Sequence, residues 1–510
     1  MSDKKEIKEI DVASLDSELA AARTLEEGKG DKFIMMASVV AFLMTSFHIY
    51  TGFFGLFDYS VQRGVHLGFA LTLILLTQPL YKHVFKDKFA GSKAFRAVCR
   101  TFDMILVVLT WVSVWMAQDE VHHLTERLSK TTWMATFAGA CLVIIVLECA
   151  RRTLGYIMPV LALIFIAYAL AGPNLPLAIA HRGYSLERIC KFLATDLDGL
   201  FGTTMSVSAT VIFMFVMFGA FLEASGCSDF INDIAISLTG KIKSGPALSA
   251  VVASGLMGTI NGSAVANVVG TGTFTIPLMK SRGYKPAFAG GVEAVASTGG
   301  QIMPPIMGAA AFIMAEMTGY DYSKIIVRAI LPAFLYFLGI FLGVHFKAKK
   351  LGLKGLPKEE LPKWKVLLPK MYLLLPLVLL VYMIIGGQTM AKSAIYATIA
   401  CIIVSLVNKD DRMTPSKFVD ALESGGKNTL SIGIACGVAG IISVCITMTG
   451  LGGKLITYIV RLADGQLIIA LLLTMICCII LGMGVPTTAN YIIMASTCAP
   501  ILINGMGMHV

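Results

Sequence analysis

The stretch that most constrains the fold is residues 245–280, an apolar run interrupted in its middle by Gly258-Thr259-Ile260-Asn261-Gly262-Ser263. About 35 apolar residues are too many for one crossing of a roughly 30 Å hydrocarbon core, and each half is short for a crossing of its own. Basic residues, which mark the cytoplasmic side, flank the run at Lys241, Lys243, Lys280, Arg282 and Lys285. We therefore expect a re-entrant hairpin that enters from the cytoplasm. Its tip is expected to be a binding site or a gate, because irregular backbone at membrane depth must be buried in protein or line an aqueous cavity.

A second interrupted run covers residues 466–504, where Gly482-Met483-Gly484-Val485-Pro486 splits the apolar sequence. The two runs share a spacing of ten residues between an asparagine and a proline, from Asn267 to Pro277 and from Asn490 to Pro500. Upstream, residues 223–226 resemble residues 447–450. Paired interrupted segments at corresponding positions indicate the binding site of a repeat-built secondary transporter. We therefore expect two repeats, each with a re-entrant hairpin.

Composition defines the class of protein. Of 510 residues, 56% are hydrophobic and only 15% are charged, which is typical of a polytopic helical membrane protein. The net charge of +10 does not indicate a nucleic-acid partner, because Lys and Arg lie in short segments between apolar runs. Residues 1–32 have no apolar core or cleavage-type sequence, so they predict a cytoplasmic tail and not a signal peptide.

The remaining apolar runs predict an alternating topology. Before the first hairpin, spans are expected at about 33–57, 64–81, 102–118, 132–150, 154–171 and 204–223. A broken helix is expected at 287–298 and 306–318, because Pro304-Pro305 removes two backbone donors between its halves. Further spans follow at 322–345, 368–386, 393–407 and 428–449, with a polar cytoplasmic loop at 408–427.

This topology places the second hairpin on the periplasmic side, so the two repeats are expected to be inverted. Inverted repeats give a binding site near the membrane midplane and a route to alternating access. The first hairpin is followed by a broken helix and another crossing, whereas the chain stops soon after the second. By this internal symmetry, we expect the C-terminal part of the second repeat to be missing from the sequence.

The hairpin tips carry the predicted chemistry. Each tip presents the negative end of one half-helix and the positive end of the next. Carbonyl groups of residues 258–262, with Ser263 and the Asn267 amide oxygen, suit a hard cation such as Na⁺, and free amides suit an anion. The same reasoning applies to residues 482–485 with Thr487, Thr488 and Asn490. Because neither hairpin contains Lys or Arg before its flanking residues, a bound carboxylate would depend on helix ends and co-bound cations.

Two intramembrane glutamates stand out, since buried carboxylates in membranes are functional candidates by default. Glu293 lies directly before the predicted break, where both a structural partner and a substrate-site residue remain open interpretations. Glu148 precedes Arg151-Arg152 and predicts an ion pair at the membrane boundary.

Three segments resemble the tripartite ATP-independent periplasmic (TRAP) transporters, in particular the fused small/large membrane permease of the TAXI branch. They are GTINGSAVANVVGTGTFTIPLMK at 258–280, GGVEAVASTGGQIMPP at 290–305 and GMGVPTTANYIIMASTCAP at 482–500. The resemblance covers nearly the whole chain. It implies a cytoplasmic tail (1–32), a small-subunit-like four-helix scaffold (33–150), a linking helix with a periplasmic or interfacial segment (151–203), a first transport repeat (204–345), a basic loop with scaffold helices (346–427), and a second repeat (428–510).

The resemblance also implies a function, namely Na⁺-driven symport of small organic anions, such as dicarboxylates or amino acids, across the bacterial inner membrane. The expected function includes an elevator-type movement and delivery of the substrate by a TAXI-type periplasmic binding protein. We also expect a monomeric permease and no cofactor beyond the coupling ion. The implied sodium residues are Gly258, Asn261, Ser263, Gly299, Gly300, Pro304, Gly484 and Thr487. The expected substrate residues are Ser263, Asn267, Glu293, Thr487, Thr488 and Asn490.

Three alternatives remain. The nearest is a stand-alone inverted-repeat Na⁺/divalent-anion symporter that works without a binding protein. A channel would need a continuous polar pore, whereas hairpins favour gated occlusion. An intramembrane enzyme is the weakest alternative, because no pair of nucleophile and base and no paired metal ligands recur within the spans; we therefore expect the chain not to be an enzyme.

Overall fold

The computed structural model describes residues 32–84, 93–123, 131–176, 179–196, 198–408, 412–464, 466–482 and 487–508. Every regular element within these ranges is helical. Ten helices in the described ranges are long and apolar enough to cross a membrane. The all-α polytopic fold predicted from composition is therefore confirmed.

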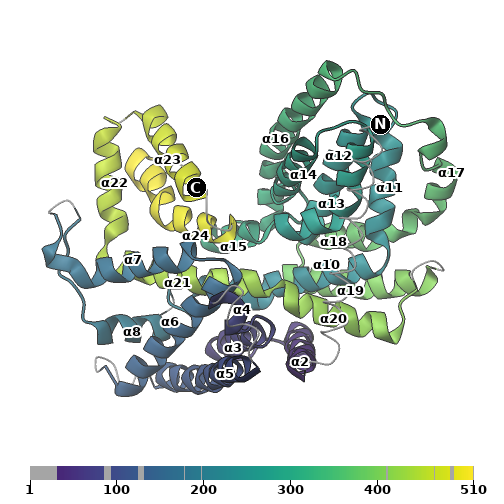
Figure 1. Cartoon of the computed structure of the whole chain (residues 1–510). Coiled ribbons are helices and arrows are strands. Elements are labelled where there is room, and N and C mark those ends of the chain that lie inside the picture. Colours follow the sequence, from purple (N-terminus) through teal and green to yellow (C-terminus); the bar gives the residue numbers. More distant parts are fainter. Residues whose placement is uncertain are drawn as a thin grey trace.

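The first helices form a scaffold at one side of the molecule (Figure 1). They are α2 (Lys32–Phe54), α3 (Tyr59–Thr77), α4 (Leu80–Val84), α5 (Lys93–His122) and α6 (Trp133–Thr153). Helix α3 packs against α2 and α5, and its residues from Leu67 to Leu76 are almost all buried. Helices α2, α3, α5 and α6 correspond to the four spans predicted between residues 33 and 150.

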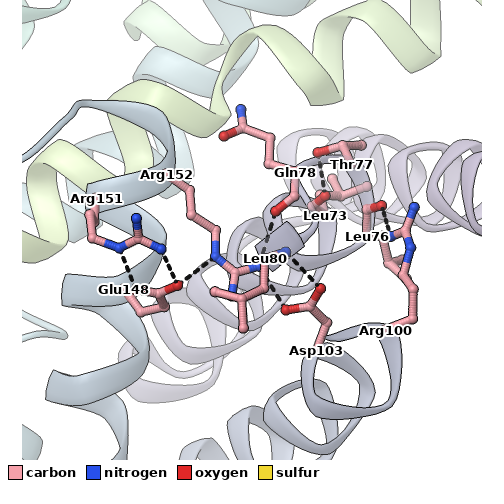
Figure 2. Close-up of polar contacts among 10 residues, drawn as sticks. All are labelled: Leu73, Leu76, Thr77, Gln78, Leu80, Arg100, Asp103, Glu148, Arg151 and Arg152. Carbon is pink, nitrogen blue, oxygen red and sulfur yellow. Dashed lines mark hydrogen bonds and ion pairs between the residues drawn. The ribbon is translucent and has the colours of Figure 1, made fainter. Parts of the chain in front are cut away.

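An ion-pair network fixes this scaffold near the end of α6 (Figure 2). Arg152 donates to Asp103 of α5 at 2.7 Å and to the backbone oxygen of Gln78 at 3.0 Å. Glu148 accepts from both Arg151 and Arg152 at 2.8 Å. The ion pair predicted for Glu148 is confirmed, and Asp103 is the partner that the sequence did not reveal.

A central layer of helices connects the scaffold to the rest of the fold. It includes α7 (Ile157–Ala171), a 3₁₀ turn (Gly172–Asn174), α8 (Leu186–Thr195), α9 (Thr203–Val207), a π-helical turn η2 (Ser208–Ile212) and α10 (Phe213–Ala224). Later in the chain, α18 (Leu375–Ile385), α19 (Met390–Val407), α20 (Pro415–Asn428) and α21 (Leu430–Thr449) join it. The short helix α17 (Trp364–Leu367) lies outside the layer, beside the helix Cys227–Thr239 (Figure 1). The 3₁₀ segments Lys358–Glu360 and Leu368–Leu374 lie before and within this later part.

The prediction of a polar loop at 408–427 is wrong for residues 415–428, which form the amphipathic helix α20. Thr414 caps this helix by accepting from the Lys417 amide, and Pro415 occupies its first turn. Ala421, Leu422, Gly425 and Gly426 are buried, and α20 packs against α10 and α2. The polar outer face of the helix accounts for the loop-like composition.

Two helical bodies rise from the same side of this layer (Figure 1). Lobe 1 comprises α11 (Cys227–Thr239), α12 (Gly245–Asn261), α13 (Ala264–Ser281), α14 (Pro286–Gly300), α15 (Ala309–Thr318) and α16 (Tyr322–Lys350). Lobe 2 comprises α22 (Leu451–Leu462), α23 (Leu467–Gly482), α24 (Thr487–Thr497) and a π-helical turn (Ile501–Gly505). The lobes meet where α15 contacts α24.

The internal repeat is visible in the order of elements. In each copy an apolar helix, α10 or α21, is followed within two residues by a glycine in the left-handed region, Gly226 with φ 81° or Gly450 with φ 66°. A short helix follows, and then a pair of helices in contact, α12 with α13 or α23 with α24. The pairs lie where the hairpins are predicted, whereas the opposite orientation of the repeats remains a prediction.

Candidate functional site

A cavity of about 580 Å³ lies between the two lobes. Lobe 1 contributes Gly262 at the first hairpin tip, the turn between α14 and α15, and the first half of α16. Lobe 2 contributes Cys478 of α23 and one face of α24. Because most of the lining is apolar and the polar groups are few, this cavity has the character of a small-molecule site.

Two cationic side chains line this cavity from α16. Lys324 and Arg328 are separated by one helical turn and therefore lie on the same face of the helix. Lys324 pairs with Asp321 at 3.1 Å in an exposed position, while the Arg328 guanidinium lies 5.7 Å from the centre of the Tyr320 ring. In the described ranges Arg328 forms no salt bridge with a carboxylate, so its charge can serve an anion in the cavity.

The second hairpin contributes Thr487, Thr488 and Asn490, which all line the same cavity. They lie in the first turn of α24, whose positive end favours negative charge. The side-chain oxygens of Asn490 and of Gln301, which lines the cavity from lobe 1, are buried without a hydrogen-bond partner. The structure therefore brings three predicted residues together with Gln301 and Arg328, which the sequence did not suggest.

The first hairpin tip has fewer free backbone carbonyl and amide groups than the sequence predicts. Gly262 has a φ of 62°, and its amide donates to the Gly258 carbonyl at 3.3 Å. Ser263 caps α13, where its hydroxyl accepts from the Ala266 amide at 3.4 Å. The Gly258 carbonyl and one of the free amides expected for ions thus already have partners within the protein.

Behind this tip the backbones of α12 and α14 touch. A Cβ atom on Gly258 would lie only 2.4 Å from the Cα of Gly300, and a Cβ on Gly299 would lie 2.4 Å from the Tyr336 ring. Asn267 is fully buried beside this contact, and its amide nitrogen donates to the Ser254 carbonyl at 2.7 Å. Its amide oxygen is buried without a partner.

The other predicted residues lie elsewhere. Glu293 is fully buried inside lobe 1 and does not line the cavity, and neither do Ser263 and Asn267. Pro304 lies in the turn between α14 and α15 and does not line the cavity, although Gln301 and Ile302 of the same turn do. Gly484 and the Asn261 side chain lie outside the described part of the structure.

Comparison with known proteins defines the family. Residues 141–509 match the model for the DctM component of the tripartite ATP-independent periplasmic transporter. The chain belongs to this family. The DctM family consists of transporter permeases and not of enzymes, in agreement with the interpretation of the sequence. With the membrane-spanning helices, membership makes the chain a multi-pass protein of the inner membrane.

Curated relatives in the family differ in the compounds that they are named for. The chain is 29% identical over 229 residues to the C4-dicarboxylate TRAP transporter large permease protein DctM of Pseudomonas aeruginosa, covering 44% of this chain and 53% of that protein. It is 23% identical over 344 residues to the isethionate TRAP transporter permease protein DctMQ of Oleidesulfovibrio alaskensis, covering 66% and 52%. It is 22% identical over 289 residues to the sialic acid permease SiaM of Vibrio cholerae, covering 56% and 67%. The chain thus spans about half the length of the first two.

Proposed function

We propose that the chain is the membrane permease of a Na⁺-coupled, binding-protein-dependent secondary transporter that imports small organic anions. The observation that carries the proposal is the cavity between the lobes, which combines Arg328 and Lys324 with the N-terminus of α24. An anion gains from both the guanidinium and the helix end. The relatives named for a dicarboxylate, a sulfonate and a sialic acid support an anionic substrate.

Sodium coupling is part of this proposal. The unpartnered Asn267 oxygen is an uncharged oxygen of the kind that hard cations take as a ligand, and it is buried beside the contact of Gly258 with Gly300. A cation bound there would lie in the same lobe as Gly262 and Gln301, which line the cavity. Bound sodium would therefore favour the anion electrostatically, and by linkage the anion would favour sodium to the same degree.

The mechanism that we propose is an elevator movement of the two lobes against the scaffold and central layer, with the repeats inverted across the membrane. The repeated order of elements supports it, because both hairpins then carry one shared site. Delivery by a periplasmic binding protein is also part of the proposal, and family membership supports it. We further propose that the periplasmic binding protein is of the TAXI type. In the permease, residues 33–150 would act as a fused small subunit, and the permease would be a monomer.

The test is uptake into proteoliposomes that hold the full-length protein. A panel of radiolabelled dicarboxylates, sulfonates, amino acids and sugar acids is offered under an imposed Na⁺ gradient, with and without candidate binding proteins. We expect uptake of at least one anion that needs both sodium and a binding protein. Sodium-driven uptake that is the same with and without every binding protein would contradict this proposal and favour the stand-alone symporter.

A further inference from the structure

A second cavity, the scaffold cavity, has a volume of about 560 Å³ and lies where α2, α4 and α5 meet. It shares no lining residue with the cavity between the lobes. Phe33 lines it from the first turn of α2, and Tyr81 lines it from α4. The remaining lining residues belong to α5 and are Arg96, Ala97, Arg100, Thr101 and Met104.

Two arginines give the scaffold cavity its charge. Arg96 and Arg100 are one helical turn apart and therefore lie on the same face of α5. The Arg96 guanidinium lies 5.7 Å from the centre of the Tyr81 ring, and the Arg100 guanidinium lies 4.3 Å from that of Phe33. One N–H group of Arg100 also donates to the Leu76 carbonyl at 2.8 Å. Contact with a ring engages the flat face of a guanidinium, whereas its N–H edge is what recognises a phosphate or a carboxylate.

The charge of this region is positive. The described lining of the scaffold cavity includes two arginines and neither aspartate nor glutamate. Lys82 of α4 and Lys93 at the start of α5 add to the positive charge. Asp103, which follows on α5, is buried in its ion pair with Arg152. A ligand of the scaffold cavity is therefore expected to be an anion.

Three predicted spans have an end at the scaffold cavity, which places it at a membrane boundary. Phe33 begins the span predicted at 33–57, and Tyr81 ends the one at 64–81. Arg100 lies two residues before the span at 102–118. Phosphate groups of lipids lie at this depth, and the surrounding basic residues mark the boundary as the cytoplasmic one.

The helix faces that line the scaffold cavity continue into the membrane as a groove. Helices α2 and α5 both pack against α3, which lies between them. On α2, Phe47 follows Phe33 by two heptads, and on α5, Trp111 follows Met104 by one, so each pair shares a face. The Phe69 ring of α3 contacts both, with its centre 6.3 Å from that of Phe47 and 5.4 Å from that of Trp111. These three rings form an apolar floor.

The outer side of the groove is apolar as well. Val108 and Trp115 follow Thr101 by one and two heptads, and both side chains are exposed. A free phosphate ion would use only the arginines, whereas a phospholipid would use the arginines and the groove together. Basic pockets between membrane helices on the cytoplasmic side suit the head groups of anionic lipids. We propose that the scaffold cavity binds an anionic phospholipid, with Arg96 and Arg100 donating to its phosphate oxygens and an acyl chain lying along the groove.

Native mass spectrometry of the full-length protein in detergent tests this and needs no transport, so its outcome is independent of the proposed function. The probes are phosphatidylglycerol and phosphatidylcholine with identical acyl chains. We expect tighter binding of phosphatidylglycerol and a loss of about tenfold or more in the double variant Arg96→Gln/Arg100→Gln, because hydrogen bonds to charged groups are lost. The control Lys349→Gln/Lys350→Gln removes two charges at the end of α16 and should bind as the unaltered protein does. Equal binding of both lipids, or equal loss in both double variants, would overturn the proposal.

A second variant keeps both arginines. Ala97→Glu places a carboxylate in the scaffold cavity from an exposed position on α5 and should weaken phosphatidylglycerol binding by a similar factor. Unchanged binding would contradict the proposal, even if the arginine variant fails to fold. Excess inorganic phosphate should leave bound phosphatidylglycerol in place, whereas its displacement would assign the cavity to a free phosphate ion and overturn the lipid site.

Discussion

Arg328 is the residue that gives the cavity its selectivity in this account. Arg328→Ala removes the charge that faces the anion, and hydrogen bonds to charged groups contribute about 1.5–3 kcal/mol. Since about 1.4 kcal/mol corresponds to a tenfold change, we expect the KM for anion uptake to rise roughly tenfold or more. Uptake kinetics in proteoliposomes measure this, with Lys347→Ala at the other end of α16 as the control. A KM equal in both variants would place the anion elsewhere.

The buried pair of Arg152 and Asp103 is expected to govern stability and not transport. Their side chains are 0% and 3% exposed, and Asp103→Ala removes the more buried of the two carboxylates that pair with this arginine, leaving only Glu148. Removing one partner of such a pair costs about 3–5 kcal/mol. Thermal unfolding in detergent should show a clear loss for Asp103→Ala and a smaller one for Glu148→Gln, whose side chain is 22% exposed. The double variant Arg152→Leu/Asp103→Leu should recover much of the loss; equal losses in all three would contradict this reading.

Local sequence could predict only part of the site at the residue scale. Thr487, Thr488 and Asn490 follow an interruption in an apolar run, so their place at a tip is encoded in adjacent residues. Arg328 is different, because nothing near it in the sequence tells which face of α16 meets the cavity. The cavity that Arg328 lines forms only where the two lobes, which are far apart in the chain, come together. The roles of all these residues remain predictions.

At the element scale, the contact between α12 and α14 depends on two glycines. Gly258→Ala would force a methyl group against the Gly300 backbone, which cannot yield as a flexible side chain does. Overpacking of this kind costs about 1–3 kcal/mol, so we expect a lower melting temperature and weaker sodium dependence of uptake. Gly270→Ala on α13 is the matched control, since a Cβ there meets nothing within 4 Å. If both variants melt alike, the contact does not hold the first hairpin in place.

Elements were predictable to different degrees for physical reasons. The hairpin pairs, and the turns at Gly226 and Gly450, follow from breaks in apolar runs. Such breaks are easy to recognise in a membrane protein, because a crossing of the hydrocarbon core needs an uninterrupted apolar run. Helix α20 was missed because an amphipathic helix against the scaffold has the composition of a polar loop. The scaffold cavity was equally hidden, since its lining comes from three helices.

At the scale of the whole molecule, the elevator proposal requires lobe 1 to move against the central layer. Phe215 of α10 and Phe312 of α15 lie across this boundary, with ring centres 4.5 Å apart. A disulfide between Phe215→Cys and Phe312→Cys should abolish uptake, and reduction should restore it. The control pair is Phe221→Cys with Phe418→Cys, which joins α10 to α20 within the layer, where the ring centres are 5.4 Å apart. Full cross-linking of the first pair without loss of uptake would rule out this movement.

The central claim is that both lobes share one anion site. The most direct measurement is a cryo-electron microscopy structure of the full-length protein in a lipid nanodisc with Na⁺ and a transported anion. The account predicts density for the anion between α16 and α24, in contact with the Arg328 guanidinium and the first turn of α24. Anion density confined to one lobe, or outside this cavity, would contradict it.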